Sequence, residues 1–295
     1  MTHSSSEGDA DAALVNRRLV VSGAIALWTG LASRPALADQ TLSSMTTVAL
    51  SEGGFSYIPD PGSPFSGGVA ALSGNTLVRV RLREPLPFEH GLDLVARHLA
   101  GANRPPAALA GLELRAPAVR SRPEFVTFNR RYWAALRTRG FVTDQIVPVA
   151  RSNMVPLYDP PATDVLSAFT YAAPGDAGEA ASDAAFLLSG RPEYDGSRVI
   201  APGDVTPGGM SRKASFVIER LRQGVATLRG NWSNLTGVQI YMTEPLPSVL
   251  EVLRVAGLTN VGLSYFQGTT PVMGFDGVRY EFEADVRAIR LERVI

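Results

Sequence analysis

Hydrophobic and polar residues alternate with two different periods in the first half of the chain. The stretch "NTLVRVRLREP" (75–85) alternates apolar and charged residues, as expected of a half-buried strand. The stretch "PFEHGLDLVARHLAGAN" follows, with a helical stripe formed by Leu92, Val95, Ala96 and Leu99. Next, "GLELRAP" predicts a short strand, and "PEFVTFNRRYWAALRTRG" predicts a second amphipathic helix that ends at Gly140. "VARSNMVP" (149–156) then predicts another strand, which carries a charged Arg151.

The second half repeats this order of elements. "SAFTYAAP" and "AAFLLSG" predict strands, and "TPGGMSRKASFVIERLRQGVATL" predicts a helix with Thr206 as N-cap and Pro207 in its first position. "TGVQIYMTE" predicts a strand, "PLPSVLEVLRVAG" a helix, and "GVRYEFEADVRAIRLE" (277–292) a long closing strand. The Pro-rich segment "PLYDPPATD" (156–164) separates the halves. We therefore expect an internal duplication of α+β class, with a mixed sheet in each half and helices on one face of it.

Composition excludes several kinds of site. The 295 residues include 28 basic and 28 acidic side chains, so no net charge attracts nucleic acid. There is no cysteine, which excludes disulfides and thiolate chemistry. The three histidines, His3, His90 and His98, do not form a metal-binding pattern, so we expect neither a metal nor another cofactor.

The N-terminal segment resembles an export signal. In "NRRLVVSGAIALWTGLASRPALADQ" (16–40), Arg17 and Arg18 precede a moderately apolar stretch, and "ALA" ends at Ala38. The alternative is a membrane anchor, but the apolar stretch is too short and too rich in small residues to span a bilayer comfortably. We expect residues 1–38 to be a twin-arginine signal and the mature protein to be periplasmic or secreted, without a stable membrane span.

Several motifs together resemble the Rid family of reactive-intermediate deaminases. In the second half these are "AFLLSGRPEYDG", "ASFVIERLRQGVATLRGNWSNLTGVQIYMTE" and "VRYEFEADVRAI"; in the first half they are "PFSGG" and "ARSNMVP". The resemblance implies two Rid-like (chorismate mutase-like) halves, residues 45–161 and 162–295. Because Rid proteins are usually trimers, it also implies a homo-oligomer, with a trimer as the expected form.

The resemblance also implies candidate site residues. Arg151 matches the Rid arginine that binds the carboxylate of a 2-imino or 2-enamino acid, with Ser152 and Asn153 beside it as further substrate-binding residues. Glu281 matches the Rid glutamate that positions the attacking water. Each half keeps one of the two residues, which predicts one composite site for a small carboxylate metabolite. The usual Rid tyrosine is replaced by Phe65.

Other interpretations remain open at this point. The helix with "FNRRYW" resembles chorismatases, which would make the protein a chorismate hydrolase using Glu281 as its acid. A non-catalytic metabolite-binding protein on a degenerate Rid scaffold is the alternative from another class. Arg151 can equally pair with an acid such as Asp159 or Glu281. Glu281, Glu283 and Asp285 can form a solvated acidic face of the closing strand.

Overall fold

The computed structural model describes residues 46–60, 63–142, 147–175, 184–274 and 277–295. The predicted signal segment, 1–38, lies outside these residues. The strands are β1 (Val48–Leu50), β2 (Phe55–Tyr57), β3 (Gly68–Ala71), β4 (Asn75–Pro87), β5 (Leu109–Arg115), β6 (Ala150–Pro156), β7 (Val165–Pro174), β8 (Phe186–Leu188), β9 (Arg191–Pro192), β10 (Gly237–Met242), β11 (Gly262–Thr269), β12 (Phe282–Ala288) and β13 (Leu291–Val294). The α-helices are α2 (Phe88–Gly101), α3 (Arg122–Thr138), α4 (Pro207–Thr227) and α5 (Leu250–Val255), with 3₁₀ turns at Pro106–Ala108, Trp232–Asn234, Leu246–Val249 and Leu258–Asn260.

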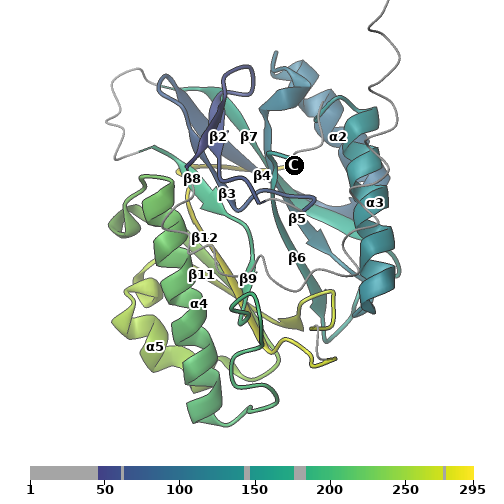
Figure 1. Ribbon diagram of the computed structural model, residues 1–295. Helices are drawn as coiled ribbons and strands as arrows, with labels where there is room; N and C mark the ends of the chain where they lie inside the picture. Colours follow the sequence, from purple (N-terminus) through teal and green to yellow (C-terminus); the bar gives the residue numbers. More distant parts are fainter. Residues whose placement is uncertain (1–45, 61–62, 143–146, 176–183, 275–276) are drawn as a thin grey trace, which may run out of the picture. The chain divides into compact units, whose positions relative to one another are not determined.

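The strands join into one mixed sheet of 13 strands, which confirms the α+β class. Their order is β1-β2-β3-β8-β12-β10-β11-β6-β5-β7-β4-β13, and β9 pairs with β12 (Figure 1). β5 is parallel to β6, β10 to β11, and β13 to β4, while the remaining named pairs are antiparallel. The sequence predicted a separate sheet in each half, but backbone hydrogen bonds between β6 and β11 connect them.

The helices cover two regions of this sheet. In Figure 1, α2 and α3 lie beside β4, β5, β6 and β7, whereas α4 and α5 lie beside β11 and β12. Two hydrophobic cores follow from this arrangement. One includes Leu92 and Leu99 of α2 with Phe169 of β7, and the other includes Val217 of α4 with Val286 of β12.

The closing strand differs from its prediction. The segment 277–292 is not one strand, because β12 ends at Ala288 and β13 starts at Leu291. β13 pairs with β4 of the first half, while β12 pairs with β10 of the second. β13 therefore joins the strands of the two halves, as the β6–β11 and β3–β8 pairs also do. β7, which follows the predicted boundary at residue 161, pairs with β4 and β5. The predicted division into 45–161 and 162–295 stays a prediction.

Alternation along β12 gives its two faces opposite character. Phe282, Ala284 and Val286 belong to the core under α4. Side chains of the intervening residues point to the opposite face, since successive side chains of a strand alternate. That face carries Glu283 and Asp285, both buried. The sheet thus has a buried polar side as well as an apolar one.

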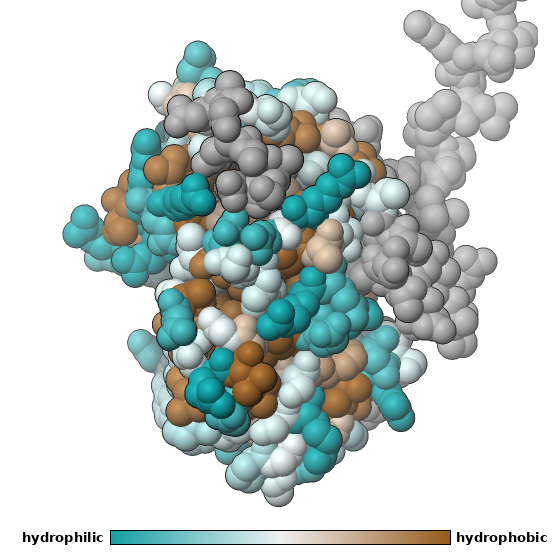
Figure 2. Space-filling model, turned by 90° about the vertical axis from the view of Figure 1, so that its left-hand side faces the viewer, coloured by the Kyte–Doolittle hydropathy of each residue, from teal (hydrophilic) through white to brown (hydrophobic). Residues whose placement is uncertain are grey.

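The surface adds two observations. In the part of Figure 2 that is not grey, hydrophobic residues form small patches separated by hydrophilic ones. In the described part of the chain, no helix combines the length and apolar character that crossing a membrane requires.

Candidate functional site

Arg151 of β6 is a buried cation surrounded by aromatic rings. Its side chain leaves the strand towards α3, and the residue is only 4% exposed. Its Cζ lies 4.3 Å from the ring centre of Phe65 and 4.7 Å from that of Tyr132, with Phe125 and Phe128 at 5.7 and 5.6 Å. Cation–π attraction to these rings stabilises the guanidinium where water does not reach it.

Arg151 has a neutral hydrogen-bond partner and no counter-ion among the described residues. Its Nη1 donates to Oδ1 of Asn129 at 3.0 Å. The alternatives that paired it with Asp159 or Glu281 are not found among the ion pairs of the described residues. Burial lowers the pKa of Arg151 to about 10, still far above neutral pH. A buried guanidinium without a carboxylate is suited to bind an anionic ligand through two parallel hydrogen bonds.

Further buried polar atoms near Arg151 have no partner within the described residues. They are the hydroxyl of Tyr132, both amide atoms of Asn153 and Nη1 of Arg120. Asn153 is two residues beyond Arg151, so their side chains leave β6 on the same face. Buried polar groups are rarely left unsatisfied in a folded protein. This cluster around Arg151 therefore has the hydrogen-bonding capacity of a ligand site.

Ser152, which the sequence grouped with Arg151 and Asn153, points to the other face of β6. Its hydroxyl donates to Oδ2 of Asp285 at 2.8 Å, and Tyr241 donates to the same oxygen at 2.8 Å. The structure thus places Arg151 and Asn153 on one side of the strand and Ser152 on the other. The reason is the two-residue period of a strand, which separates neighbours in sequence.

Glu281 lies in a buried cluster with two other charged residues. Its Oε2 is 2.7 Å from Nζ of Lys213, a fully buried side chain that also donates to the carbonyls of Ala201 and Asp204. The backbone N–H of Glu281 donates to Oε1 of Glu193 at 2.5 Å. Burial raises the pKa of Glu193 to about 7. Glu281 is therefore engaged by a lysine, while Glu193 titrates near neutral pH.

Glu283 connects this cluster to Arg151. The N–H of Gly190 donates to the carbonyl of Arg151 at 3.2 Å, and Oε1 of Glu283 lies where a side chain at residue 190 would begin, so any larger residue there would displace the carboxyl group of Glu283. Burial raises the pKa of Glu283 well above its usual value, and the neighbouring charges of Asp285 and Glu193 raise it further. Arg151 opposes this rise. The solvated acidic face that the sequence also allowed is thus wrong, because Glu281, Glu283 and Asp285 are all buried.

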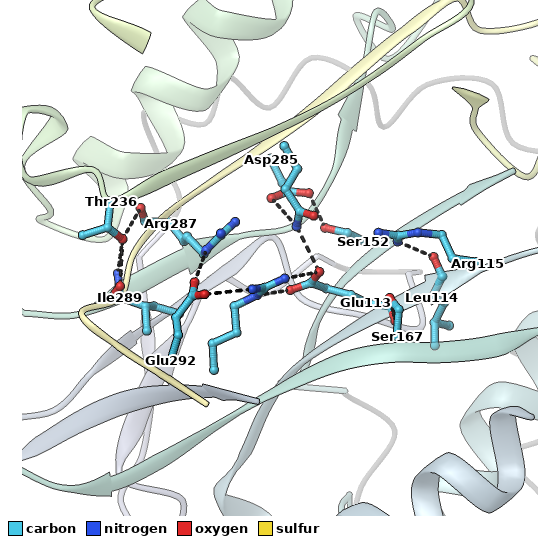
Figure 3. A network of polar contacts seen from close by, with 12 residues as sticks. Glu113, Leu114, Arg115, Ser152, Ser167, Thr236, Asp285, Arg287, Ile289 and Glu292 are labelled. Carbon is cyan, nitrogen blue, oxygen red and sulfur yellow. Dashed lines mark hydrogen bonds and ion pairs between the residues drawn. The ribbon is translucent and has the colours of Figure 1, made fainter. Parts of the chain in front are cut away.

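A second polar network extends along the buried side of the sheet (Figure 3). Nε and Nη2 of Arg79 donate to the two carboxylate oxygens of Glu113 at 2.6 and 2.9 Å, and Gln239 bridges Glu113 and Asp285. Burial alone would raise the pKa of Glu113, but Arg79 lowers it to about 2. The adjoining cavity measures about 10 Å³, room for roughly one water molecule. This cavity is too small to admit an organic acid.

Some of these residues could not be selected from the sequence. Asn129 and Tyr132 lie in the "FNRRYW" segment, and their proximity to Arg151 depends on how α3 packs on β6. Trp133 of the same segment packs against the first-half core, under the guanidinium of Arg137. Among the described residues, no group of three or more histidine, aspartate or glutamate side chains is arranged to hold a metal.

Comparisons with known proteins agree on one kind of activity. The model of the family described as 2-aminomuconate deaminase CnbZ matches residues 47–293. The 2-amino-5-chloromuconate deaminase of Comamonas testosteroni is 33% identical over 256 residues, which cover 84% of this chain and 98% of that protein.

Proposed function

The chain belongs to the 2-aminomuconate deaminase CnbZ family and is a hydrolytic deaminase, and we propose that it binds the carboxylate of its substrate through Arg151. The substrate is an enamino or imino acid of the 2-aminomuconate type, which loses its nitrogen as ammonia. The sequence-based prediction of an imine or enamine deaminase is confirmed at this level. The single observation that carries the site assignment is the buried Arg151 with no counter-ion among the described residues.

The reaction balances without a redox partner. Protonation of the enamine at carbon, with loss of a proton from nitrogen, gives the 2-imine, and water then adds to C2 to form a carbinolamine. The C2–N bond breaks as nitrogen takes up a proton, which releases ammonia and leaves a 2-oxo diacid. One water is consumed and one ammonia is released for each substrate. The protein therefore has to hold the carboxylate beside C2 and to move protons.

Arg151 is suited to the first task. A carboxylate bound to its guanidinium supplies the charge that the folded protein does not, and the surrounding rings exclude water from the ion pair. Asn129 fixes one side of the guanidinium by accepting from Nη1. Asn153, which is on the same face of β6, has an amide available to the substrate. Ser152, predicted as a third contact, instead supports Asp285.

Glu283 is suited to the second task. Its raised pKa extends the pH range in which it is a neutral acid beyond that of an ordinary glutamate, which suits it to donate a proton to the enamine and take one back from water. Its carboxyl group lies against Gly190, which is hydrogen-bonded to the backbone of Arg151. Glu281, the catalytic residue predicted from the sequence, is the second candidate, and its ion pair with Lys213 gives it a positioning role beside Glu193.

We further propose that the fold is a duplicated Rid-like unit. In residues 75–174 the strand order is β6-β5-β7-β4, and in residues 186–288 it is β11-β10-β12-β8. In both sets the first two strands are parallel and the others antiparallel. This equivalence supports the duplication that the sequence predicts, with one site assembled from Arg151 of the first set and Glu283 or Glu281 of the second.

Export through residues 1–38 and assembly into a homo-oligomer, a trimer by analogy with Rid proteins, remain proposals. The arginine pair, the apolar stretch and the "ALA" site support export. Fractionation of cells that produce the full chain tests it: the processed protein in the periplasm agrees with export, and an unprocessed cytoplasmic protein contradicts it. Light scattering of the purified protein tests the oligomer.

The activity is tested with a substrate panel. Purified protein is incubated separately with 2-aminomuconate, with 2-iminopropanoate generated by an amino-acid oxidase, and with chorismate. The release of ammonia is measured for the first two compounds and the loss of chorismate for the third. Ammonia release from 2-aminomuconate well above the spontaneous rate agrees with the proposal. Chorismate loss alone would favour the chorismatase alternative. Binding of the acids without turnover would favour the binding protein.

A further inference from the structure

We propose that Arg120 binds the second carboxylate of the substrate and so makes the enzyme selective for dicarboxylates. This inference rests on the proposed function and deepens it. A 2-aminomuconate carries one carboxylate beside the reacting carbon and another at the far end of a six-carbon chain. Arg151 accounts for the first of these. A second cation, placed where the far carboxylate of the bound substrate lies, would distinguish this substrate from imines of ordinary amino acids.

Arg120 has an unused hydrogen-bonding edge in a buried place. Its Nη2 lies 2.7 Å from both carboxylate oxygens of Asp164, whereas its buried Nη1 has no partner in the described residues. Its side chain is 15% exposed. A structural ion pair alone would use the outer edge of the guanidinium for a fork onto Asp164. Instead only Nη2 donates to Asp164, and Nη1 remains available to a ligand.

The two arginines lie against the same ring. The Cζ atoms of Arg120 and Arg151 are 4.6 and 5.6 Å from the ring centre of Phe128, so they are about 10 Å apart at most. The terminal carboxyl carbons of an extended six-carbon chain are roughly 6 Å apart, since five carbon–carbon bonds of about 1.4–1.5 Å follow a zigzag. A diacid that lies alongside the two arginines can therefore place one carboxylate on each guanidinium.

The backbone of Arg120 is fixed by the second half of the chain. Its N–H donates to the carbonyl of Pro271 at 2.9 Å, and its carbonyl accepts from the N–H of Met273 at 3.1 Å. The segment before α3 is thus paired with the segment after β11. Asp164 orients the side chain from the start of β7. These contacts hold Arg120 in place before substrate binds, which reduces the entropy lost on binding.

A pair of inert ligands tests the assignment without turnover. Muconate and sorbate have the same six-carbon diene, but sorbate lacks the second carboxylate. Calorimetry on the wild-type protein is expected to show that muconate binds on the order of 10- to 100-fold more tightly than sorbate. This is the gain in affinity expected from one hydrogen-bonding contact between charged groups. In Arg120→Gln the two ligands should bind about equally, with most of the change in the affinity for muconate. An unchanged preference in Arg120→Gln, or no preference in the wild type, overturns the proposal.

Kinetics provide a second readout. With 2-aminomuconate, Arg120→Gln should raise KM on the order of 10- to 100-fold, and with 2-iminopropanoate the rise should be several times smaller. An equal loss on both substrates would mean a structural role and contradict the proposal. If the wild type turns over neither substrate, the proposed function fails, while the muconate and sorbate affinities still decide the role of Arg120. Arg131→Gln on α3, which removes an exposed ion pair with Glu89, is the matched control.

Discussion

Replacing Arg151 with methionine should abolish activity with little effect on folding. Burial lowers the pKa of this arginine from its usual 12.5 to about 10, which corresponds to a cost of about 3 kcal/mol for keeping it charged in the fold at neutral pH. Because the pKa is lowered, this cost is present at every pH below about 10 and is relieved only as the pH rises towards 12.5. Methionine is two atoms shorter but unbranched and flexible, so it can fill much of the same space, and it removes the cost entirely.

Two losses oppose that gain. The guanidinium gives up its contacts with Phe65 and Tyr132, about 1–2 kcal/mol together at a desolvated site. Oδ1 of Asn129 loses its donor, which costs about 1–3 kcal/mol. The sum stays within about 2 kcal/mol of the wild type. A buried arginine that stabilises the fold through an ion pair would instead cost about 3–5 kcal/mol on removal.

Thermal unfolding and ammonia release measure the two effects on the same samples. For a protein of this size about 1 kcal/mol moves Tm by roughly 2–4 °C, so we expect Arg151→Met within several degrees of the wild type. Two charged hydrogen bonds to the substrate carboxylate predict a loss of kcat/KM on the order of 10²- to 10⁴-fold. Muconate should raise the Tm of the wild type and not that of the variant. If the Tm of Arg151→Met were more than about 10 °C below that of the wild type, Arg151 would be a stabilising residue of the fold, which would refute this prediction. Arg131→Met, at an exposed position, should match the wild type in both assays.

Four further variants test the carboxylates. Glu283→Gln should lower kcat on the order of 10²- to 10⁴-fold. Because the pKa of Glu283 is raised and its acid form donates the proton, wild-type activity should fall as pH rises through that pKa. Glu281→Gln should do less, and the reverse order of effects would return the catalytic role to Glu281. Glu193→Gln should stabilise the protein by about 3 kcal/mol above pH 7. The reason is that the pKa of Glu193 rises from 4.5 to about 7 on folding, so the stability of the wild type falls as pH rises through this range. Equal Tm values of wild type and variant at pH 8 would contradict this. Glu113→Gln should lower the free energy of unfolding by about 3 kcal/mol, because it leaves Arg79 buried with a weaker partner. In the wild type, the stabilisation from the Glu113 carboxylate is present above pH 4.5 and disappears as pH falls to about 2. An unchanged Tm of the variant at pH 7 would be inconsistent with this.

The sequence predicted the elements best where one face of a strand or helix is apolar. β4 alternates the apolar residues Val78, Val80 and Leu82 with arginines clearly enough to be identified, and α2 and α4 carry complete apolar stripes. β11, in contrast, is mostly half-buried and mixes Gly262, Gln267 and aromatic residues, so its period is weak. The break between β12 and β13 depends on pairing with β4, a contact that local sequence does not encode.

The residues of the candidate site also divide into those that the sequence could indicate and those that only the fold brings together. Arg151 could be chosen because a charge within an apolar strand is unusual, and the Rid-like motif supported it. Its partner Asn129 is 22 residues away in sequence, and the glycine that admits Glu283 is in a different segment again. The resemblance favoured Glu281 over Glu283, yet the ion pair with Lys213 and the raised pKa of Glu283 emerge only from packing. Burial, which changes the chemistry of both acids, is a property of the fold.

The most direct measurement of the central claim is ammonia release from 2-aminomuconate by the wild type and by Arg151→Met, side by side, at temperatures where both are fully folded. The account predicts rapid release by the wild type and a loss on the order of 10²-fold or more in the variant, with muconate inhibiting the wild type competitively. Equal rates in the two proteins would show that the carboxylate is held elsewhere and would contradict the assignment of Arg151.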